Sequence, residues 1–193
     1  LAIVGFSDKA MKATETATLP RTFFDIKDMQ KGYDNNAFPY TPPVGLMNGL
    51  KRALELIEAE GLENVFARHT RIATGVRHAV QAWGLELCAV SPKVYSDSVS
   101  AIRTPEGFNA TDIVTVAAEK YGMAFGVGLG EVAGKVFRIG HLGSLTDAMM
   151  LSGLGVAEMV MVDLGLDIKL GSGVAAAQEF YRHGSGAGKK AAA

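Results

Sequence analysis

In the sequence KVFRIG, residues 135–140, an apolar run follows Lys135 and is interrupted by one arginine, Arg138. A short apolar run flanked by glycine is typical of a buried β-strand. The guanidinium of Arg138 always carries a charge, so burying it without a partner is costly. Two interpretations of Arg138 stay open. It can face water, because side chains alternate along a strand, or it can clamp a substrate carboxylate through two hydrogen bonds.

The sequence around this strand predicts a small α+β domain. We expect further strands at residues 85–90, 99–104 and 123–127. Asn109 opens a predicted helix that continues to about Tyr121, and further helices are predicted at 146–162 and 174–181. The order β-β-α-β-β-α favours a mainly antiparallel sheet with helices on one face.

The first residues read as a strand from another sheet. Residues 1–6 are apolar throughout, as in strands that are buried on both faces of a parallel sheet. The next run with equal strand character begins only at Leu85, and a lone buried strand cannot satisfy its backbone groups. We therefore expect the partner strands upstream of Leu1. A helix should begin after Ser7 or Asp8, either of which suits the N-cap.

A long connection and two helices separate these regions. Residues 13–43 lack periodicity, and a connection of that length is more often functional than idle. Thr41 followed by Pro42 is a typical helix start. Apolar residues then repeat at helical spacing in two segments, which end at Gly61 and Gly84. We interpret residues 42–84 as linking helices.

Composition excludes several classes of function. The net charge is −1, so neither nucleic acid nor a membrane surface is an expected partner. Residues 145–166 are apolar, but three acidic residues among them argue against a membrane span. Cys88 is the only cysteine, in keeping with a cytoplasmic location, and we expect it to be a small buried hydrophobe in a strand.

The remaining motifs carry little chemistry. The glycine-rich stretch 126–130 lies between two predicted strands, whereas a nucleotide-binding loop lies between a strand and a helix. The stretch 184–190 has the wrong spacing for a phosphate loop, and we expect a flexible tail at 184–193. His141 follows a strand end, where a structural role is the commoner one. The spacing of the histidines indicates no metal site.

The sequence GKVFRIGHLG, residues 134–143, resembles the C-terminal signature of class V pyridoxal-phosphate aminotransferases. Residues 7–10, 41–43 and 61–64 are also similar to the serine–glyoxylate and alanine–glyoxylate branch. The resemblance extends over nearly the whole chain. It implies an α/β fold, namely the C-terminal part of the aspartate-aminotransferase-like fold, in a homodimer with active sites at the subunit interface.

That resemblance also implies domain boundaries. Residues 1–41 would end the large domain that binds pyridoxal 5'-phosphate, and residues 42–84 would be the linking helices. Residues 85–183 would form the small α+β domain. The Schiff-base lysine is expected upstream of Leu1, and Lys9 corresponds to an ordinary helix lysine. This chain alone should therefore be inactive, because that lysine is both the covalent anchor and the proton shuttle.

The resemblance assigns two site residues. Arg138 corresponds to the arginine that binds the substrate carboxylate, and Thr41 to a threonine that reaches the cofactor phosphate across the dimer. Phe38 stands where some relatives have a phosphate-binding tyrosine, and the role of Tyr40 is open. The implied reaction moves an amino group from serine or alanine to glyoxylate, giving glycine and a 2-oxo acid. The alternatives are a non-catalytic carboxylate-binding module and a dimerisation module.

Overall fold

The structure is a computed structural model that describes residues 1–183, so the predicted tail lies outside the described residues. The chain divides into two compact units, Leu1–Ala59 and Glu60–Ala193, which are described separately.

The first unit is helical. Helix α1 spans Asp8–Thr16, the 3-10 helix η1 spans Thr22–Phe24, α2 spans Ile26–Asp34 and α3 spans Val44–Glu60. The Ser7 hydroxyl accepts a hydrogen bond from the N–H of Ala10, which confirms the predicted cap. The expectation that residues 13–43 lack regular structure is wrong for α2, whose start is capped by Asp25.

The strand predicted at residues 1–6 does not form. These residues are exposed and belong to no sheet, and the strands that the structure describes all lie in the second unit. An apolar run becomes a strand only when a neighbour satisfies its N–H and C=O groups. The described residues provide no such neighbour.

The second unit combines a small sheet with four α-helices. Strand β1 spans Val99–Arg103, β2 spans Gly126–Val127 and β3 spans Val136–Gly140. The strand order is β1-β3-β2 with antiparallel pairing, as the sequence predicts. The helices are α4 (Leu62–Ala82), α5 (Ala110–Tyr121), α6 (Asp147–Asp163) and α7 (Ser172–His183), and the 3-10 helices are η2 (Pro92–Val94) and η3 (Gly130–Val132).

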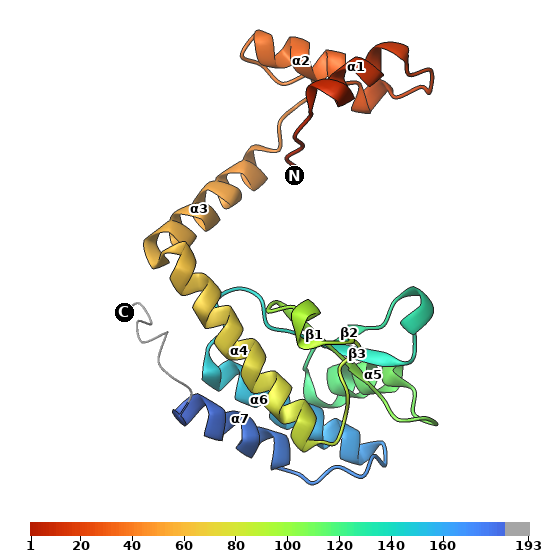
Figure 1. Ribbon diagram of the computed structural model, residues 1–193, viewed down its shortest axis with the longest axis vertical. Helices are drawn as coiled ribbons and strands as arrows, with labels where there is room; N and C mark the ends of the chain where they lie inside the picture. Colours follow the sequence, from red (N-terminus) through yellow and green to blue (C-terminus); the bar gives the residue numbers. More distant parts are fainter. Residues whose placement is uncertain (184–193) are drawn as a thin grey trace. The chain divides into compact units, whose positions relative to one another are not determined.

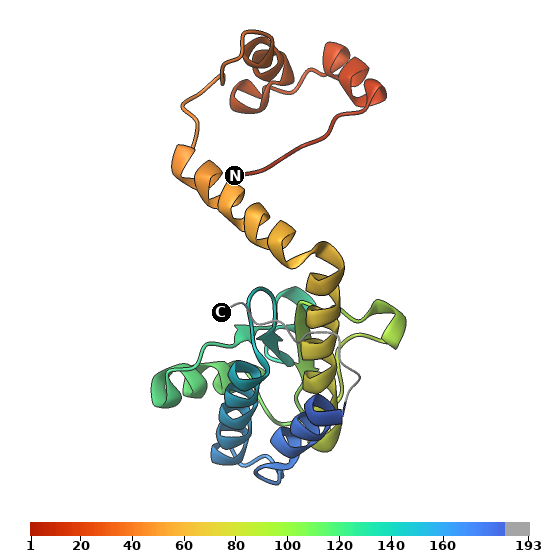
Figure 2. The same cartoon turned by 90° about the vertical axis from the view of Figure 1, so that its left-hand side faces the viewer.

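One face of the sheet forms the core with the helices. Ile102, Phe137 and Ile139 are buried on this face and belong to one apolar cluster with residues of all four helices. Helices α4, α6 and α7 lie side by side, and α5 packs on β2, β3 and α6 (Figures 1 and 2). The opposite face carries Ala101 and Arg138, which are half-buried, and Arg103, which is exposed.

The strand predicted at residues 85–90 is reduced to one bridge, between Leu87 and Ile102. The N–H of Leu85 donates to the carbonyl of Val80 and so helps to end α4. Only the short stretch that follows pairs with β1 through its backbone. The N–H of Cys88 donates to the carbonyl of Ala101, and the N–H of Arg103 donates to the carbonyl of Glu86. Cys88 is half-buried and not fully buried as expected.

Close helix packing between α4 and α7 depends on a glycine. The Tyr181 ring on α7 fills the space that a Cβ at Gly75 on α4 would occupy. The Tyr181 hydroxyl donates to the carbonyl of Ile72 at 3.0 Å. Burial raises the pKa of Tyr181, so the phenol stays protonated and keeps this hydrogen bond.

Glu158 is a buried carboxylate at the centre of the helical layer, with an exposed fraction of 2%. It accepts hydrogen bonds from the indole N–H of Trp83 at 2.9 Å and from the backbone N–H of Gly173 at 2.7 Å. The N–H groups of Gly171 and Val174 also donate to it. The negative charge therefore sits on the free N–H groups at the start of α7, where the helix dipole stabilises it.

We predict that Glu158→Ala lowers the free energy of unfolding by about 3 kcal/mol, because several buried donors lose their acceptor. Urea unfolding followed by circular dichroism measures this. The matched control is Glu179→Ala on α7, where the carboxylate is 69% exposed. That substitution should cost less than about 0.5 kcal/mol. Equal costs for the two substitutions would contradict the role of Glu158.

Candidate functional site

Arg138 lies in the middle of β3, on the sheet face opposite the core. Its side chain is half-buried, and its Nε donates to the carbonyl oxygen of Val127 at 2.8 Å. No acidic side chain among residues 1–183 forms an ion pair with it. Because Nε is occupied, Nη1 and Nη2 form the free end of the guanidinium, and this end can bind both oxygens of a carboxylate.

Small neighbours make room for this side chain. Ala101 pairs with Arg138 on one side and Gly126 on the other. A Cβ at Gly126 would lie 3.1 Å from Arg138 Nε and 3.2 Å from Arg138 Cβ. Gly126 therefore allows the guanidinium to lie against β2. The sequence places Gly126 only in a glycine-rich turn, because its closeness to Arg138 depends on strand pairing.

A buried histidine fixes the C-terminal end of β3. His141 follows the strand and is 1% exposed. Its Nδ1 lies 3.0 Å from the carbonyl of Asp97, and its Nε2 lies 3.0 Å from the Ser100 hydroxyl. The carbonyl requires a proton on Nδ1, and in the neutral form of the ring Nε2 then accepts from the Ser100 hydroxyl. Burial lowers the pKa of His141, which favours this neutral form. The structural role expected for His141 is confirmed.

The loop after β3 is held by helix α4. The N–H of Gly143 donates to His69 Nε2 at 3.0 Å, and the Arg68 guanidinium donates to the Gly143 carbonyl. His69 Nδ1 lies 2.7 Å from the carbonyl of Val65, which orients the ring. Both backbone groups of Gly143 are therefore bound by α4, so the strand that carries Arg138 is anchored in the helical layer.

An ion-pair network supports the start of β1. Asp97 accepts hydrogen bonds from Arg77 at 2.6 Å and from Thr70. Burial alone would raise the pKa of Asp97, but these two hydrogen bonds outweigh it and lower the pKa. The carbonyl of Asp97 is the acceptor for His141, so the network connects α4 with both β1 and β3.

Thr41 belongs to the first unit and is exposed. It does not cap α3, which begins at Val44, three residues later. Two prolines follow Thr41, and a residue before proline is disfavoured from helical geometry, so the helix starts late. The N–H of Val44 donates to the carbonyl of Pro42 and that of Met47 to the carbonyl of Pro43, whereas the N–H groups of Gly45 and Leu46 have no backbone acceptor among residues 1–183.

The aromatic residues before Thr41 differ in their surroundings. Tyr40 stacks on Phe23 with ring centroids 4.6 Å apart, and its hydroxyl donates to the carbonyl of Thr22 at 3.2 Å. Phe38 is exposed and has no hydroxyl to offer. Thr41 and Arg138 lie in different compact units of the chain.

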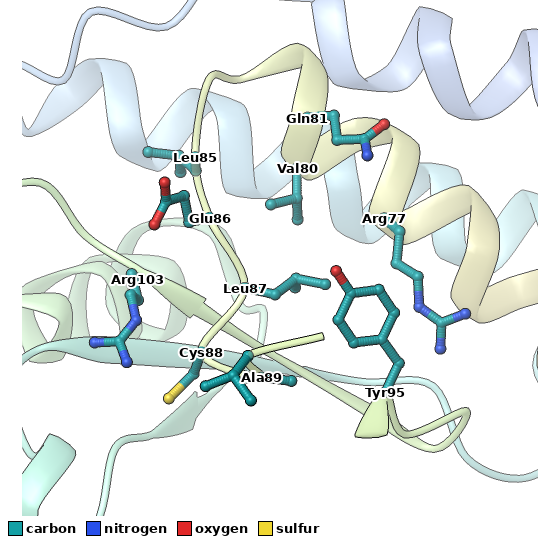
Figure 3. Close-up of a pocket in the computed structure, with 11 residues that line it drawn as sticks. Arg77, Val80, Gln81, Leu85, Glu86, Leu87, Cys88, Ala89, Tyr95 and Arg103 are labelled. Carbon is teal, nitrogen blue, oxygen red and sulfur yellow. The ribbon is translucent and has the colours of Figure 1, made fainter. Parts of the chain in front are cut away.

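A cavity of about 480 Å³ surrounds the segment 85–90 next to α4, and Arg103 at the end of β1 is among its lining residues (Figure 3). Val80 and Leu87 line its apolar side, and Arg77 and Tyr95 line its polar side. Arg138 does not line it. Within residues 1–183 no group of histidine, cysteine and acidic side chains could hold a metal ion, and no helix is long and apolar enough to cross a membrane.

Comparison with known proteins identifies the family. The chain is 73% identical over 193 residues to an L-aspartate–glyoxylate aminotransferase of Paracoccus denitrificans and covers 49% of that protein. It is 51% identical over 183 residues to a serine–glyoxylate aminotransferase of Hyphomicrobium methylovorum, with 94% of the chain and 45% of the relative aligned. The chain belongs to the class V pyridoxal-phosphate aminotransferases. No protein-family model matches it.

Solved aminotransferase structures confirm the fold. The pyridoxamine–pyruvate aminotransferase of Mesorhizobium loti superposes with a TM-score of 0.83 at 33% identity, over 94% of this chain and 47% of the other. The ureidoglycine–glyoxylate aminotransferase of Bacillus subtilis has a TM-score of 0.81 at 21% identity, which supports the fold alone. The chain thus spans about half the length of the curated aminotransferases it matches, their C-terminal half.

We predict that Gly126→Ala in the full-length protein weakens the binding of a simple carboxylate, propionate, about tenfold. The added methyl group displaces the guanidinium from the position in which Val127 holds it, which costs about one charged hydrogen bond. Calorimetric titration gives the dissociation constant. Gly140→Ala is the control, since a Cβ there has no atom within 4 Å. Equal affinities in the two variants would contradict the positioning role of Gly126.

Proposed function

We propose that the full-length protein containing this chain is an aminotransferase that uses pyridoxal 5'-phosphate and transfers an amino group to glyoxylate. The observation that carries the proposal is the half-buried guanidinium of Arg138, which has no acidic partner among the described residues and has Nη1 and Nη2 free. The curated relatives named above, all glyoxylate aminotransferases, support the choice of acceptor. The products are glycine and a 2-oxo acid.

Aspartate is the donor that we propose first. The relative at 73% identity is named for aspartate, whereas the serine–glyoxylate aminotransferases are 51% identical or less. The sequence by itself favours serine or alanine, so this proposal changes the expected donor. Serine stays the second candidate because those relatives align with at least 94% of the chain.

Groups just before and in the first turn of α3 suit the binding of the cofactor phosphate. Thr41 offers an exposed hydroxyl, and the free N–H groups of Gly45 and Leu46 lie at a helix N-terminus, which favours an anion. These three groups would hold the phosphate, and in the proposed homodimer they would serve the site of the partner subunit. When bound, the cofactor supplies the electron sink that lets the amino group change carriers.

Arg138 would orient both substrates of the two half-reactions. Amino acids and 2-oxo acids share a carboxylate, so one clamp serves the donor, the acceptor and both products. Binding through two hydrogen bonds fixes the direction of the substrate, and orientation of this kind lowers the barrier without any proton transfer by arginine.

The domain assignment follows from the same proposal. Residues 1–41 would complete the large cofactor-binding domain, residues 42–84 would link the domains, and residues 85–183 would form the small domain that carries Arg138. The division between the two compact units, after Ala59, falls inside the proposed linking segment.

We predict that Arg138→Ala in the full-length enzyme raises KM for the amino donor and for glyoxylate by about 100-fold, because each loses a bidentate charged interaction. Steady-state kinetics with varied donor and acceptor measure this. Arg52→Ala, an exposed arginine on α3 paired only with Glu55, is the control and should leave both constants unchanged. Unchanged KM values in Arg138→Ala would remove Arg138 from the site.

We also predict where the cofactor is attached. Reduction of the full-length protein with borohydride, followed by peptide mass mapping, should place a pyridoxyl group on a lysine outside residues 1–193. An adduct on Lys9, in the first turn of α1, would contradict the assignment of Lys9 as an ordinary helix residue. A full-length protein without any adduct would favour the non-catalytic carboxylate-binding alternative.

A further inference from the structure

A second arginine shares the sheet face with Arg138. Arg103 is the last residue of β1, where it pairs with Val136, and Ala101 pairs with Arg138. Residues two apart in a strand point to the same face, so Arg103 lies diagonally across from Arg138 on neighbouring strands. Diagonal neighbours of this kind are about 7–8 Å apart, which is within reach of long side chains.

The close-up view agrees with this placement. Arg103, Glu86 and Cys88 lie on the side of the segment 85–90 that faces away from α4, whereas Val80 and Leu87 lie on the side of the helix (Figure 3). The register gives the same division, since Leu87 is bridged to Ile102, whose side chain is in the core.

Arg103 lies opposite Glu86 across the strand pair but forms no ion pair with it in the described structure. Its side chain is exposed and forms no ion pair within residues 1–183. Glu86 is its cross-strand neighbour and accepts a hydrogen bond from its backbone N–H at 2.8 Å, but the two side chains are not paired. Ala101 and Val136 lie between the two arginines on this face, and Val136 is buried.

Two guanidinium groups at this spacing suit a ligand with two carboxylates. Arg138 takes the carboxylate that all amino acids and 2-oxo acids share. A second carboxylate on a short side chain would extend along the sheet face toward Arg103. The N–H donors of the Arg103 guanidinium form a fork that matches the two oxygens of a carboxylate. An amino donor with a hydroxyl or methyl side chain has no second carboxylate for Arg103 to bind.

We propose that Arg103 determines donor specificity by binding the side-chain carboxylate of a dicarboxylic amino donor such as aspartate. This inference rests on the proposed aminotransferase function and extends it to the choice of substrate. Arg103 makes no contact with the amino group that is transferred, so its effect is confined to donors and products that carry the second carboxylate.

The test compares aspartate with serine as donors for the full-length holoenzyme, with glyoxylate as acceptor. Arg103→Ala should raise KM for aspartate about 10- to 100-fold and leave KM for serine and glyoxylate within about twofold. Arg103→Lys should recover part of the aspartate affinity, since it keeps the charge but loses the fork. Arg182→Ala, an exposed arginine on α7, controls for the loss of a surface charge.

Other results overturn the inference in distinguishable ways. An unchanged KM for aspartate in Arg103→Ala, or an equal rise for aspartate and serine, removes the specificity role while the proposed function stands. A wild-type enzyme that accepts serine but not aspartate has the same consequence. A wild-type holoenzyme that transfers no amino group to glyoxylate from either donor overturns the proposed function, and the role of Arg103 with it.

Discussion

The hydrogen bond from Arg138 Nε to the carbonyl of Val127 holds the guanidinium on the sheet face opposite the core. It places a charge on one side of a strand whose other side, at Phe137 and Ile139, is fully in the core. A strand can combine these environments because its side chains alternate. The direction of the guanidinium is therefore set by β-sheet pairing, and the pairing is set by the helical layer beneath it.

Around this strand, polar contacts are concentrated where the chain must be held in place. His141 and Gly143 bind the end of β3 to Asp97 and to α4, and Glu158 binds the start of α7 to the end of α4. Each contact satisfies a buried donor or acceptor that would otherwise cost free energy. Arg138 and Arg103 form no ion pair within the described residues, which is what suits them to an anionic ligand.

Much of the fold was predictable from signals between residues close together in the sequence. Caps at Ser7 and Asn109, stops at Gly61 and Gly84, and the alternation in KVFRIG all depend on residues close in sequence, and the structure confirms them. The two strand predictions that failed have a common cause. Residues 1–6 and 85–90 look like strands, but a strand needs partners that local sequence does not specify. Thr41 as a cap failed because two prolines delayed α3. The closeness of Gly126 and Arg103 to Arg138 comes from register, which the sequence alone does not reveal.

The most direct test of this account is a crystal structure of the full-length enzyme with maleate, an unreactive dicarboxylate. One carboxylate should lie on Nη1 and Nη2 of Arg138, with Nε still bonded to the carbonyl of Val127. The second carboxylate should lie beside Arg103. Maleate bound away from β3, or an Arg138 side chain that has left Val127 to reach it, would contradict the claim that strand pairing presets the carboxylate clamp.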